Sequence, residues 1–481
     1  MKGSKFMQPI ELKEKHVSTA LFQFIIPFSL KAGTDQNLSL YLEEQDFTLF
    51  QLSDVQMEHA YYGSYHVSHR DLEAFFLPLT NKILFPTSEQ QKGFQRYTKK
   101  LDINSLLTAR HVSIPFHIHS VDLFICPYDF GFLTIRTEIN NLSLSQTIEF
   151  ADCLRILEPQ LQKSKIEYGG KVYPLIMDFL FDYLVPQLTN YMNNEAGTFL
   201  TTQKMYVQSL LSISGEELID SVDVYRTGTL CGLNSAGNPY VRANNLEYIS
   251  KYINDYGYNR WAPSTSYFID DQSFSCITIE KEIELSFLIE QFYGPFYYAL
   301  LINLFHKLVF LKISDDFTFT NINQDKKEVD KLIYTINSFT SNYFFAEYPA
   351  STEGQELFNH LRKSFTIDNL YSNTKDILYS LFKYDENNMM KRDSLVLLVL
   401  TLYTVICGIF SMNLFTHDLE GKINWSHFKY YNPFEYFAVG IVLSGIIVVA
   451  ILGFQSLYQA FQDRIRRKKR LQESVTSSKK Q

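Results

Sequence analysis

Two long uncharged apolar runs lie close together near the C-terminal end of the chain. The first extends from Ser394 to Thr416, and the second from Tyr436 to Phe461. At about 1.5 Å per residue, a helix of either length crosses a hydrocarbon core of about 30 Å. Neither run has the polar face that a helix on the surface of a globular domain presents. We therefore predict two transmembrane helices, at residues 394–416 and 434–461.

The charges that flank these runs predict their orientation. Lys391 and Arg392 precede the first run, and a basic cluster at 464–470 follows the second. The connecting loop, residues 417–433, carries equal numbers of acidic and basic residues. Because basic residues accumulate on the cytoplasmic side of membrane proteins, both chain ends are expected in the cytoplasm and the loop outside. We expect a multi-pass protein of the cell (inner) membrane, with the lipid bilayer as a partner.

Composition restricts the rest of the chain. The mean hydropathy of -0.12 over 481 residues does not fit a bundle of many spans. A net charge of -8 argues against direct nucleic-acid binding, which depends on neutralising phosphates. The five cysteines are scattered without a CxxC pair, which predicts neither disulfides nor a zinc cage. The N-terminus lacks the apolar segment of a signal peptide.

Periodicity in the first half predicts a mixed α/β domain. His111 to His119 alternates apolar and polar side chains, as a half-buried strand does. Leu123–Cys126 and Phe132–Ile139 are predicted as two strands joined by a turn at 127–131. An amphipathic helix is predicted from Ser143 to Leu157.

Two local patterns are candidate sites. His111, His117 and His119 share one face of the predicted strand, but they lack a carboxylate or cysteine partner, so we favour a solvent-exposed face over a metal site. The segment 168–171, Tyr-Gly-Gly-Lys, predicts a hairpin turn and lacks the residues of a phosphate loop. No nucleophile–base pair or paired carboxylates are recognisable, so we expect no enzyme.

The second half is predicted to be mostly helical. Lys281–Phe292 and Lys326–Phe345 are predicted helices, and Thr352 is expected to open another with a capping box. The apolar stretch Phe296–Leu311 is short and interrupted by polar residues, so we expect a buried helix there and not a third span. From Thr366 to the first apolar run no Gly or Pro interrupts the helical pattern. This predicts a rod of about 45 residues, or roughly 70 Å, of the kind found in oligomeric stalks.

The expected architecture is an α+β cytoplasmic domain followed by a long stalk helix and two C-terminal transmembrane helices. Its predicted parts are a cytoplasmic α/β domain (1–275), a helical and stalk region (276–393), a first transmembrane helix (394–416), an outer loop (417–433), a second transmembrane helix (434–461) and a basic cytoplasmic tail (462–481).

The end of the first apolar run carries a short motif, Ser411-Met412-Asn413, before the outer loop. This layout resembles the CorA family of magnesium channels, in which a long stalk helix becomes the pore helix and ends in Gly-Met-Asn. Met412 and Asn413 match that signature, whereas Ser411 stands where the family has glycine. The resemblance implies a homopentamer, a pore helix at 394–416, Mg²⁺ or another divalent cation as permeant ion, and Asn413 as the selectivity position. By the same resemblance Asp418 and Glu420 would concentrate cations at the outer mouth, although they equally fit ordinary loop charges.

The first run has a polar stripe at the 3.5-residue period of packed helices. Its positions are Asn387, Met390, Ser394, Leu397, Thr401, Thr404, Gly408 and Ser411. Threonine hydroxyls on this stripe could replace water around a cation, with Leu397 as an apolar gate. The other side offers Leu395, Val399, Leu402 and Ile406 to lipid or to the second helix. The alternative is that the hydroxyls bond back to the i-4 carbonyls and Gly408 only permits close packing.

Two other functions remain open. The part before the first span, residues 1–393, is larger than is usual in the CorA family. It is similar in this respect to CorA-like membrane effectors of type III CRISPR antiviral defence, which a nucleotide second messenger gates. In that case the aromatic stretch 296–311 is a candidate ligand pocket, although no nucleotide-binding motif is visible. The third alternative is a membrane-tethered scaffold without a pore.

Overall fold

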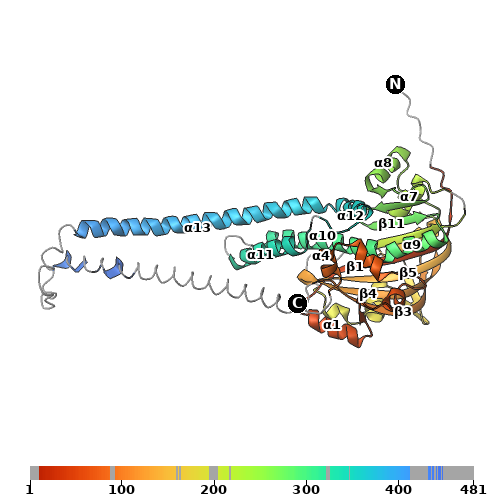
Figure 1. Cartoon of the computed structure of the whole chain (residues 1–481), viewed down its shortest axis with the longest axis horizontal. Coiled ribbons are helices and arrows are strands. Elements are labelled where there is room, and N and C mark those ends of the chain that lie inside the picture. The colour runs from red at the N-terminus through yellow and green to blue at the C-terminus, as the bar shows by residue number, and fades with distance from the viewer. Residues whose placement is uncertain are drawn as a thin grey trace, which may run out of the picture. The chain divides into compact units, whose positions relative to one another are not determined.

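The structure, a computed structural model, has a large sheet domain and a long helix (Figure 1). It describes residues 10–86, 93–158, 161, 164–193, 204–215, 218–320, 326–345, 347–411, 432–434, 436–437, 440, 443–445 and 447. The mixed α+β class is therefore as predicted. The chain divides into two compact units, Met1–Tyr379 and Ser380–Gln481. The domain boundary expected after residue 275 falls inside a strand of the sheet.

One 11-stranded sheet forms the centre of the first unit, in the order β7-β6-β3-β4-β5-β1-β8-β11-β10-β9, with β2 paired to β3. Neighbouring strands are antiparallel except for the parallel pair β8 and β11. The strands are β1 (His16–Ser29), β2 (Thr48–Leu49), β3 (Gln95–Thr108), β4 (Ser113–Cys126), β5 (Phe130–Ser143), β6 (Lys165–Tyr168), β7 (Lys171–Tyr173), β8 (Tyr206–Ile213), β9 (Gly257–Tyr258), β10 (Thr265–Ile269) and β11 (Ser273–Thr278).

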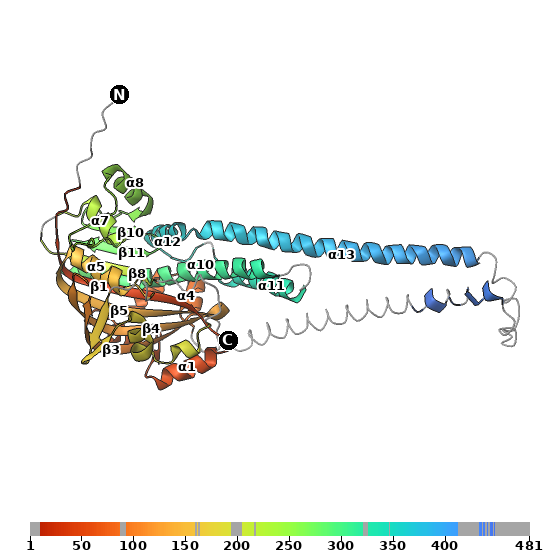
Figure 2. The same cartoon turned by 180° about the vertical axis from the view of Figure 1, so that it is seen from behind.

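Helices cover both faces of this sheet (Figures 1 and 2). They are α1 (Asp35–Glu44), α2 (Met57–Ala60), α3 (His69–Phe75), α4 (Pro78–Leu84), α5 (Leu144–Leu154), α6 (Ile176–Asp178), α7 (Ser221–Gly228), α8 (Leu246–Tyr256), α9 (Glu282–Tyr293), α10 (Pro295–Phe319), α11 (Lys326–Asn342), α12 (Thr352–Ser364) and α13 (Ile367–Ser411). On one face the ring of Phe150 in α5 packs 5.5 Å from Phe22 in β1 and 5.3 Å from Phe116 in β4. On the other face Gln23 of β1 donates to the carbonyl of Phe292 in α9.

Most local predictions are confirmed. Helix α5 begins at the N-cap Ser143, which forms a full capping box with Gln146. The hairpin between β6 and β7 turns at Gly169 and Gly170, both with positive φ. The division of 111–126 into two strands is wrong, because 113–126 is a single strand with a bulge between Ile118 and Ser120. That bulge interrupts the alternation on which the prediction was based.

The start of α12 differs from the prediction by one residue. Ser351, and not Thr352, is the N-cap, and its hydroxyl accepts a hydrogen bond from the backbone N–H of Gly354. Serine and threonine are both good N-caps, so the sequence pattern alone did not separate them.

The apolar stretch 296–311 forms the buried first part of α10, as predicted. Within the described residues, the segment Glu282–Phe319 is the one helical segment long and apolar enough to cross a membrane, and 83% of its most apolar stretch is buried in the protein. A shorter apolar helical stretch covers Asp393–Ile406. Most of the second apolar run lies outside the described residues, so the two C-terminal spans stay a prediction.

Candidate functional site

Helix α13 carries every described position of the predicted stripe. It runs without a break from Ile367 to Ser411, 45 residues or about 68 Å (Figure 1). The predicted continuous helix is thus confirmed. Ile367, Thr374 and Leu381 are buried at a spacing of seven residues. From residue 382 onwards every described side chain of α13 is exposed or half-buried.

One face of the apolar part of α13 is half-buried. Its residues are Val396, Val399, Tyr403 and Ile406, at spacings of three and four that keep them on one side of a helix. The Tyr403 hydroxyl donates to Ser444 Oγ at 2.8 Å. A Cβ atom placed on Gly445 would lie 3.2 Å from the Tyr403 ring. This face of α13 therefore packs against the described part of the second apolar run.

The predicted stripe lies on the opposite side of α13. Ser394, Leu397, Thr401 and Thr404 each precede a half-buried residue by two positions, a rotation of about 200°. All four are exposed. On the predicted opposite side, Val399 and Ile406 are half-buried, whereas Leu395 and Leu402 are 64% and 58% exposed.

The two threonines on the stripe bond back to their own helix. Thr401 Oγ1 donates to the carbonyl of Leu397 at 2.7 Å, and Thr404 Oγ1 to that of Leu400 at 2.8 Å. These are the i-4 bonds expected of any threonine in a membrane helix. They use the hydroxyl hydrogen and leave oxygen lone pairs as acceptors on the exposed face.

The other stripe positions are placed as follows. Asn387, Met390 and Gly408 are exposed, and Ser411 is the last residue of α13. Met390, Ser394, Leu397 and Thr401 line an open groove together with Asp393, Leu398, Leu402 and Val405. Met412, Asn413, Asp418 and Glu420 lie outside the described residues.

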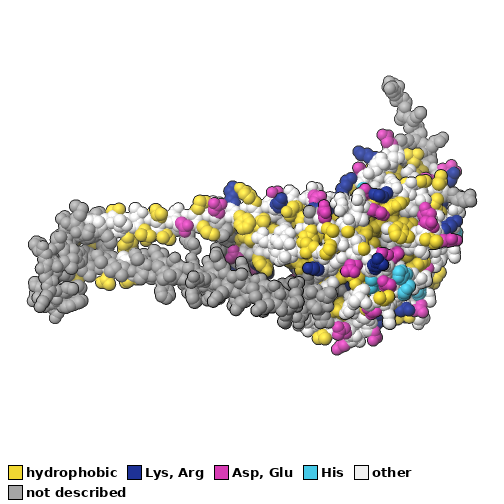
Figure 3. Space-filling model, viewed as in Figure 1, with side chains coloured by type: hydrophobic (Ala, Val, Ile, Leu, Met, Phe, Trp, Pro, Cys, Tyr) yellow, Lys and Arg dark blue, Asp and Glu magenta, His cyan; other side chains and the backbone are white. Residues whose placement is uncertain are grey.

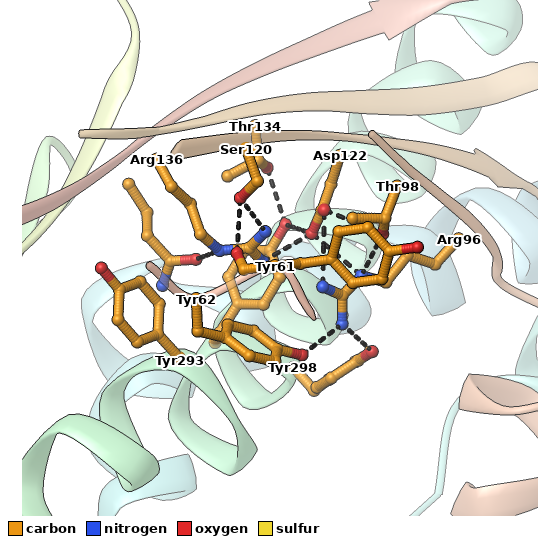
Figure 4. A network of polar contacts seen from close by, with 12 residues as sticks. Tyr61, Tyr62, Arg96, Thr98, Ser120, Asp122, Thr134, Arg136, Tyr293 and Tyr298 are labelled. Carbon is orange, nitrogen blue, oxygen red and sulfur yellow. Dashed lines mark hydrogen bonds and ion pairs between the residues drawn. The ribbon is translucent and has the colours of Figure 1, made fainter. Parts of the chain in front are cut away.

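A buried charge cluster within the sheet domain was not predicted (Figure 4). Its centre is Asp122 of β4, between Arg96 of the neighbouring strand β3 and Arg136 of β5. Arg136 Nη2 lies 2.5 Å and Arg96 Nε 2.9 Å from Asp122 Oδ2. All three side chains are buried. Burial raises the pKa of Asp122, but the two guanidinium groups outweigh it and hold the pKa below its ordinary value.

Tyrosine side chains cover this cluster on one face of the sheet, among them Tyr298 of α10 and Tyr62 (Figure 4). Arg96 Nη1 donates to the hydroxyls of Tyr298, at 2.9 Å, and of Tyr62, at 3.1 Å. Tyr297 donates to Thr134 of β5 at 2.7 Å, and its ring lies 5.2 Å from the Arg136 guanidinium. Two cations and one anion leave a net positive charge inside the domain, which these neutral oxygens and rings solvate. Through these contacts the cluster connects α10 to strands β3, β4 and β5.

The three histidines of the strand prediction have separate partners. His111 Nε2 lies 2.9 Å from the carbonyl of Ser235, and His117 Nε2 lies 2.9 Å from Asp102. His119 is 3% exposed and shares a hydrogen bond with the Tyr293 hydroxyl, so its expected exposure is wrong. The described residues contain no group of three potential metal ligands.

No protein-family model and no curated protein matches this chain. We therefore infer function from α13 and from the charge cluster themselves.

The first prediction concerns the Asp122 carboxylate. Asp122→Asn keeps the shape but leaves two guanidinium groups buried without an anion, so we expect a loss of about 3–5 kcal/mol in unfolding free energy. Chemical denaturation of the purified protein measures this loss. Asp102→Asn is the matched control, since the Asp102 side chain is 86% exposed, and we expect less than about 1 kcal/mol there. Equal small effects from both variants would show that the cluster does not hold the domain together.

The second prediction concerns acidification. Burial lowers the pKa of both His119 and His306 to about 3. The unfolded chain takes up these protons below about pH 6.5, whereas the folded domain does not until about pH 3, so stability falls as the pH falls. For each of the two histidines, the free energy of unfolding should be about 2 kcal/mol lower at pH 5 than at pH 7.5.

Thermal unfolding at the two pH values tests this, with His119→Gln and His306→Gln each reducing the pH dependence. The control is the same substitution at an exposed histidine, His16→Gln. A wild-type slope in both buried-histidine variants would contradict the assignment.

Proposed function

We propose that this chain is a CorA-like membrane channel for divalent cations such as Mg²⁺, with no enzymatic activity. In this proposal α13 of each copy lines a common pore, and the sheet domain controls its opening. The observation that carries it is the position of the polar stripe. Ser394, Thr401 and Thr404 lie opposite the face that packs against the second apolar run, so a ring of such hairpins would turn the stripe to its axis.

The exposed apolar side chains of α13 support a membrane location. Figure 3 shows hydrophobic side chains on the surface of the helix. Among the described residues of the apolar part, the exposed large hydrophobic side chains are between 48% and 70% exposed, and they are Leu395, Leu397, Leu398, Leu400, Leu402 and Val405. Leaving this much apolar surface in water is unfavourable, at about 25 cal/mol per Å². Lipid and neighbouring copies would cover it, with both chain ends in the cytoplasm as the flanking charges predict.

Exposed residues N-terminal to the apolar part support self-association. Tyr379, Phe382 and Met389 are 68%, 49% and 48% exposed and lie on one flank of α13. They lie away from the buried positions Thr374 and Leu381, so the helix has an apolar flank free for another copy. The number of five copies comes from the CorA resemblance.

The stripe supplies chemistry suited to a partly hydrated cation. The outward oxygen lone pairs of Thr401 and Thr404 can accept hydrogen bonds from its water shell or replace part of it. Leu397, 70% exposed, would form an apolar constriction. By resemblance, Ser411, Met412 and Asn413 form the selectivity signature, with Asp418 and Glu420 at the outer mouth.

Contacts within the sheet domain support control of α13 by that domain. Tyr371, in the first turns of α13, packs 6.0 Å from Phe310 of α10 and 4.7 Å from Phe344. The same helix α10 is bound to the charge cluster through Tyr297 and Tyr298. A displacement of α10 on the sheet would therefore reach the start of the pore helix through direct ring contacts.

The aromatic side chains of 296–311 favour a packing role over a ligand pocket. Phe296, Tyr298 and Phe305 are at most 1% exposed, and Phe305 packs 5.0 Å from Phe94 in an edge-to-face contact. The nucleotide-gated antiviral effector and the scaffold without a pore are accordingly kept as outcomes of the experiment.

The third prediction is ion flux. The purified chain in liposomes that contain a Mg²⁺ indicator should carry Mg²⁺, and Asn413→Ala should abolish that flux. Thr401→Val with Thr404→Val removes both hydroxyls at constant shape and should lower the flux at least about tenfold. The control, Val399→Ile with Ile406→Val, exchanges aliphatic side chains on the half-buried face opposite the stripe and should have little effect.

The other outcomes separate the alternatives. Flux that appears only after a nucleotide is added would favour the effector. A monomer in detergent that carries no ion would favour the scaffold and overturn the channel proposal.

A further inference from the structure

Helices α12 and α13 are separated by two residues, Phe365 and Thr366. Phe365 has φ -85° and ψ 1°, close to helical values, whereas Thr366 has φ 54°. A positive φ is rare for a β-branched residue, because its Cβ crowds the backbone, and this position after a helix is most often a glycine. The corner between α12 and α13 therefore depends on one strained residue.

The local sequence does not require this corner. From Gln355 to Cys407 the chain contains neither glycine nor proline, so no helix-breaking residue separates the two helices. A helical φ near -63° at Thr366, a change of about 117°, would join α12 and α13 into one helix from Thr352 to Ser411. The first N–H groups of α13 and the last carbonyls of α12 would then pair with each other, as they do inside a helix.

Contacts with distant parts of the chain hold the corner in its bent form. Ser364 Oγ donates to the carbonyl of Ile269 in β10 at 2.8 Å. The buried Phe365 ring packs 5.6 Å from the Tyr206 ring of β8 and lies 5.2 Å from the Lys307 ammonium of α10. The bend is therefore imposed by the sheet and by α10.

One ion pair is specific to the bent form. Arg362 of α12 donates to Asp368 of α13 at 2.7 Å, across the corner. In a continuous helix, residues six positions apart point about 120° away from each other, so this pair could not form. The bent and straight forms therefore have different contacts, as two discrete states require.

Helix α13 is held to the domain less firmly than α12. In α12 the buried Leu357, Phe358 and Leu361 occupy adjacent turns, and the Phe358 ring stacks 4.7 Å from Tyr348. The described part of α13 has at most one buried side chain in every seven residues. Straightening would therefore turn α13 and not α12, and would end the contact of Tyr371 with α10.

We propose that the corner at Thr366 is a two-state joint, bent as in the structure and straight when α12 and α13 form one helix. The sheet and α10 hold the bent state, and the helical propensity of the chain favours the straight one. A displacement of α10 away from Phe365 would release the joint. The joint does not depend on the proposed channel, but its effect on ion flux does, since it assumes that α13 lines a pore.

The fourth prediction concerns two opposite substitutions at this residue. Thr366→Gly should favour the bent state, because glycine adopts a positive φ freely and disfavours a helix interior. Thr366→Ala should favour the straight state, because alanine is the best helix former and keeps the penalty at positive φ. The ratio of bent to straight chains should differ between the two variants on the order of tenfold or more.

Pulsed electron paramagnetic resonance measures this ratio from the distance between spin labels at the exposed Asn359 and Asn373 of the full-length chain. Non-canonical amino acids carry the labels, so the native cysteines stay unchanged, and an excess of unlabelled chain dilutes the labelled copies. In one continuous helix the two positions lie on the same side about 21 Å apart, and the bend brings them closer.

Two further variants control the measurement. Ser372→Gly makes a similar change at an exposed position that is helical in both states, so it should leave the ratio unchanged. Lys307→Met removes the ammonium over Phe365 without altering the corner itself, and it should increase the straight population. One identical distance in the wild type, Thr366→Gly, Thr366→Ala and Lys307→Met would overturn the joint.

Mg²⁺ flux of the same variants in liposomes separates the joint from the channel. If both proposals hold, Thr366→Gly and Thr366→Ala should change the flux in opposite directions relative to the wild type. A shifted ratio with unchanged flux would support the joint and overturn its link to the pore. A shifted ratio in a chain that carries no ion would support the joint and overturn the channel.

Discussion

The Asp122 carboxylate lies between two guanidinium groups on three adjacent strands, and the placement of α10 depends on that contact. A carboxylate buried alone would be neutral, and two buried guanidinium groups without it would repel each other. Together they form a cationic centre that needs oxygen acceptors and aromatic faces around it. Tyr297 and Tyr298 supply these from α10, so the charge cluster and the helix position stabilise each other.

This constraint extends to α13. Helix α10 contacts α13 through Phe310 and Tyr371, and α10 is held by hydrogen bonds and charge in addition to apolar packing such as that of Phe305 on Phe94. Directional polar contacts have fewer acceptable arrangements than apolar ones, so α10 is expected to move between discrete positions or not at all. In the proposed channel such a helix could transmit a movement of the sheet domain to α13, because a small shift of α10 on the sheet would not be absorbed by rearrangement of its side-chain packing.

The sequence patterns correctly predicted the features that depend on interactions between residues close together in the chain. The capping box at Ser143, the glycine turn at Gly169 and the unbroken α13 each depend on residues within a few positions of one another. The charge cluster depends on strand register, which brings residues 96, 122 and 136 together. The solvent exposure predicted for His119 was wrong for the same reason, since its hydrogen-bond partner Tyr293 is 174 residues away. The sequence pattern put Val399 and Ile406 on the side offered to lipid or to the second helix, but it did not predict the contact of Tyr403 with Ser444, because these residues are 41 positions apart.

The length of the stripe places a geometric condition on any pore built from it. A straight α-helix drifts by about 20° per heptad from a 3.5-residue repeat. Asn387 and Gly408 are three heptads apart, so in straight helices their directions would differ by about 60°. A left-handed supercoil of the helices would remove this difference, as in coiled coils. Without supercoiling, 60° still leaves Asn387 on the half of α13 that faces the axis when Gly408 does. The stripe is therefore compatible with both a straight and a supercoiled arrangement of α13.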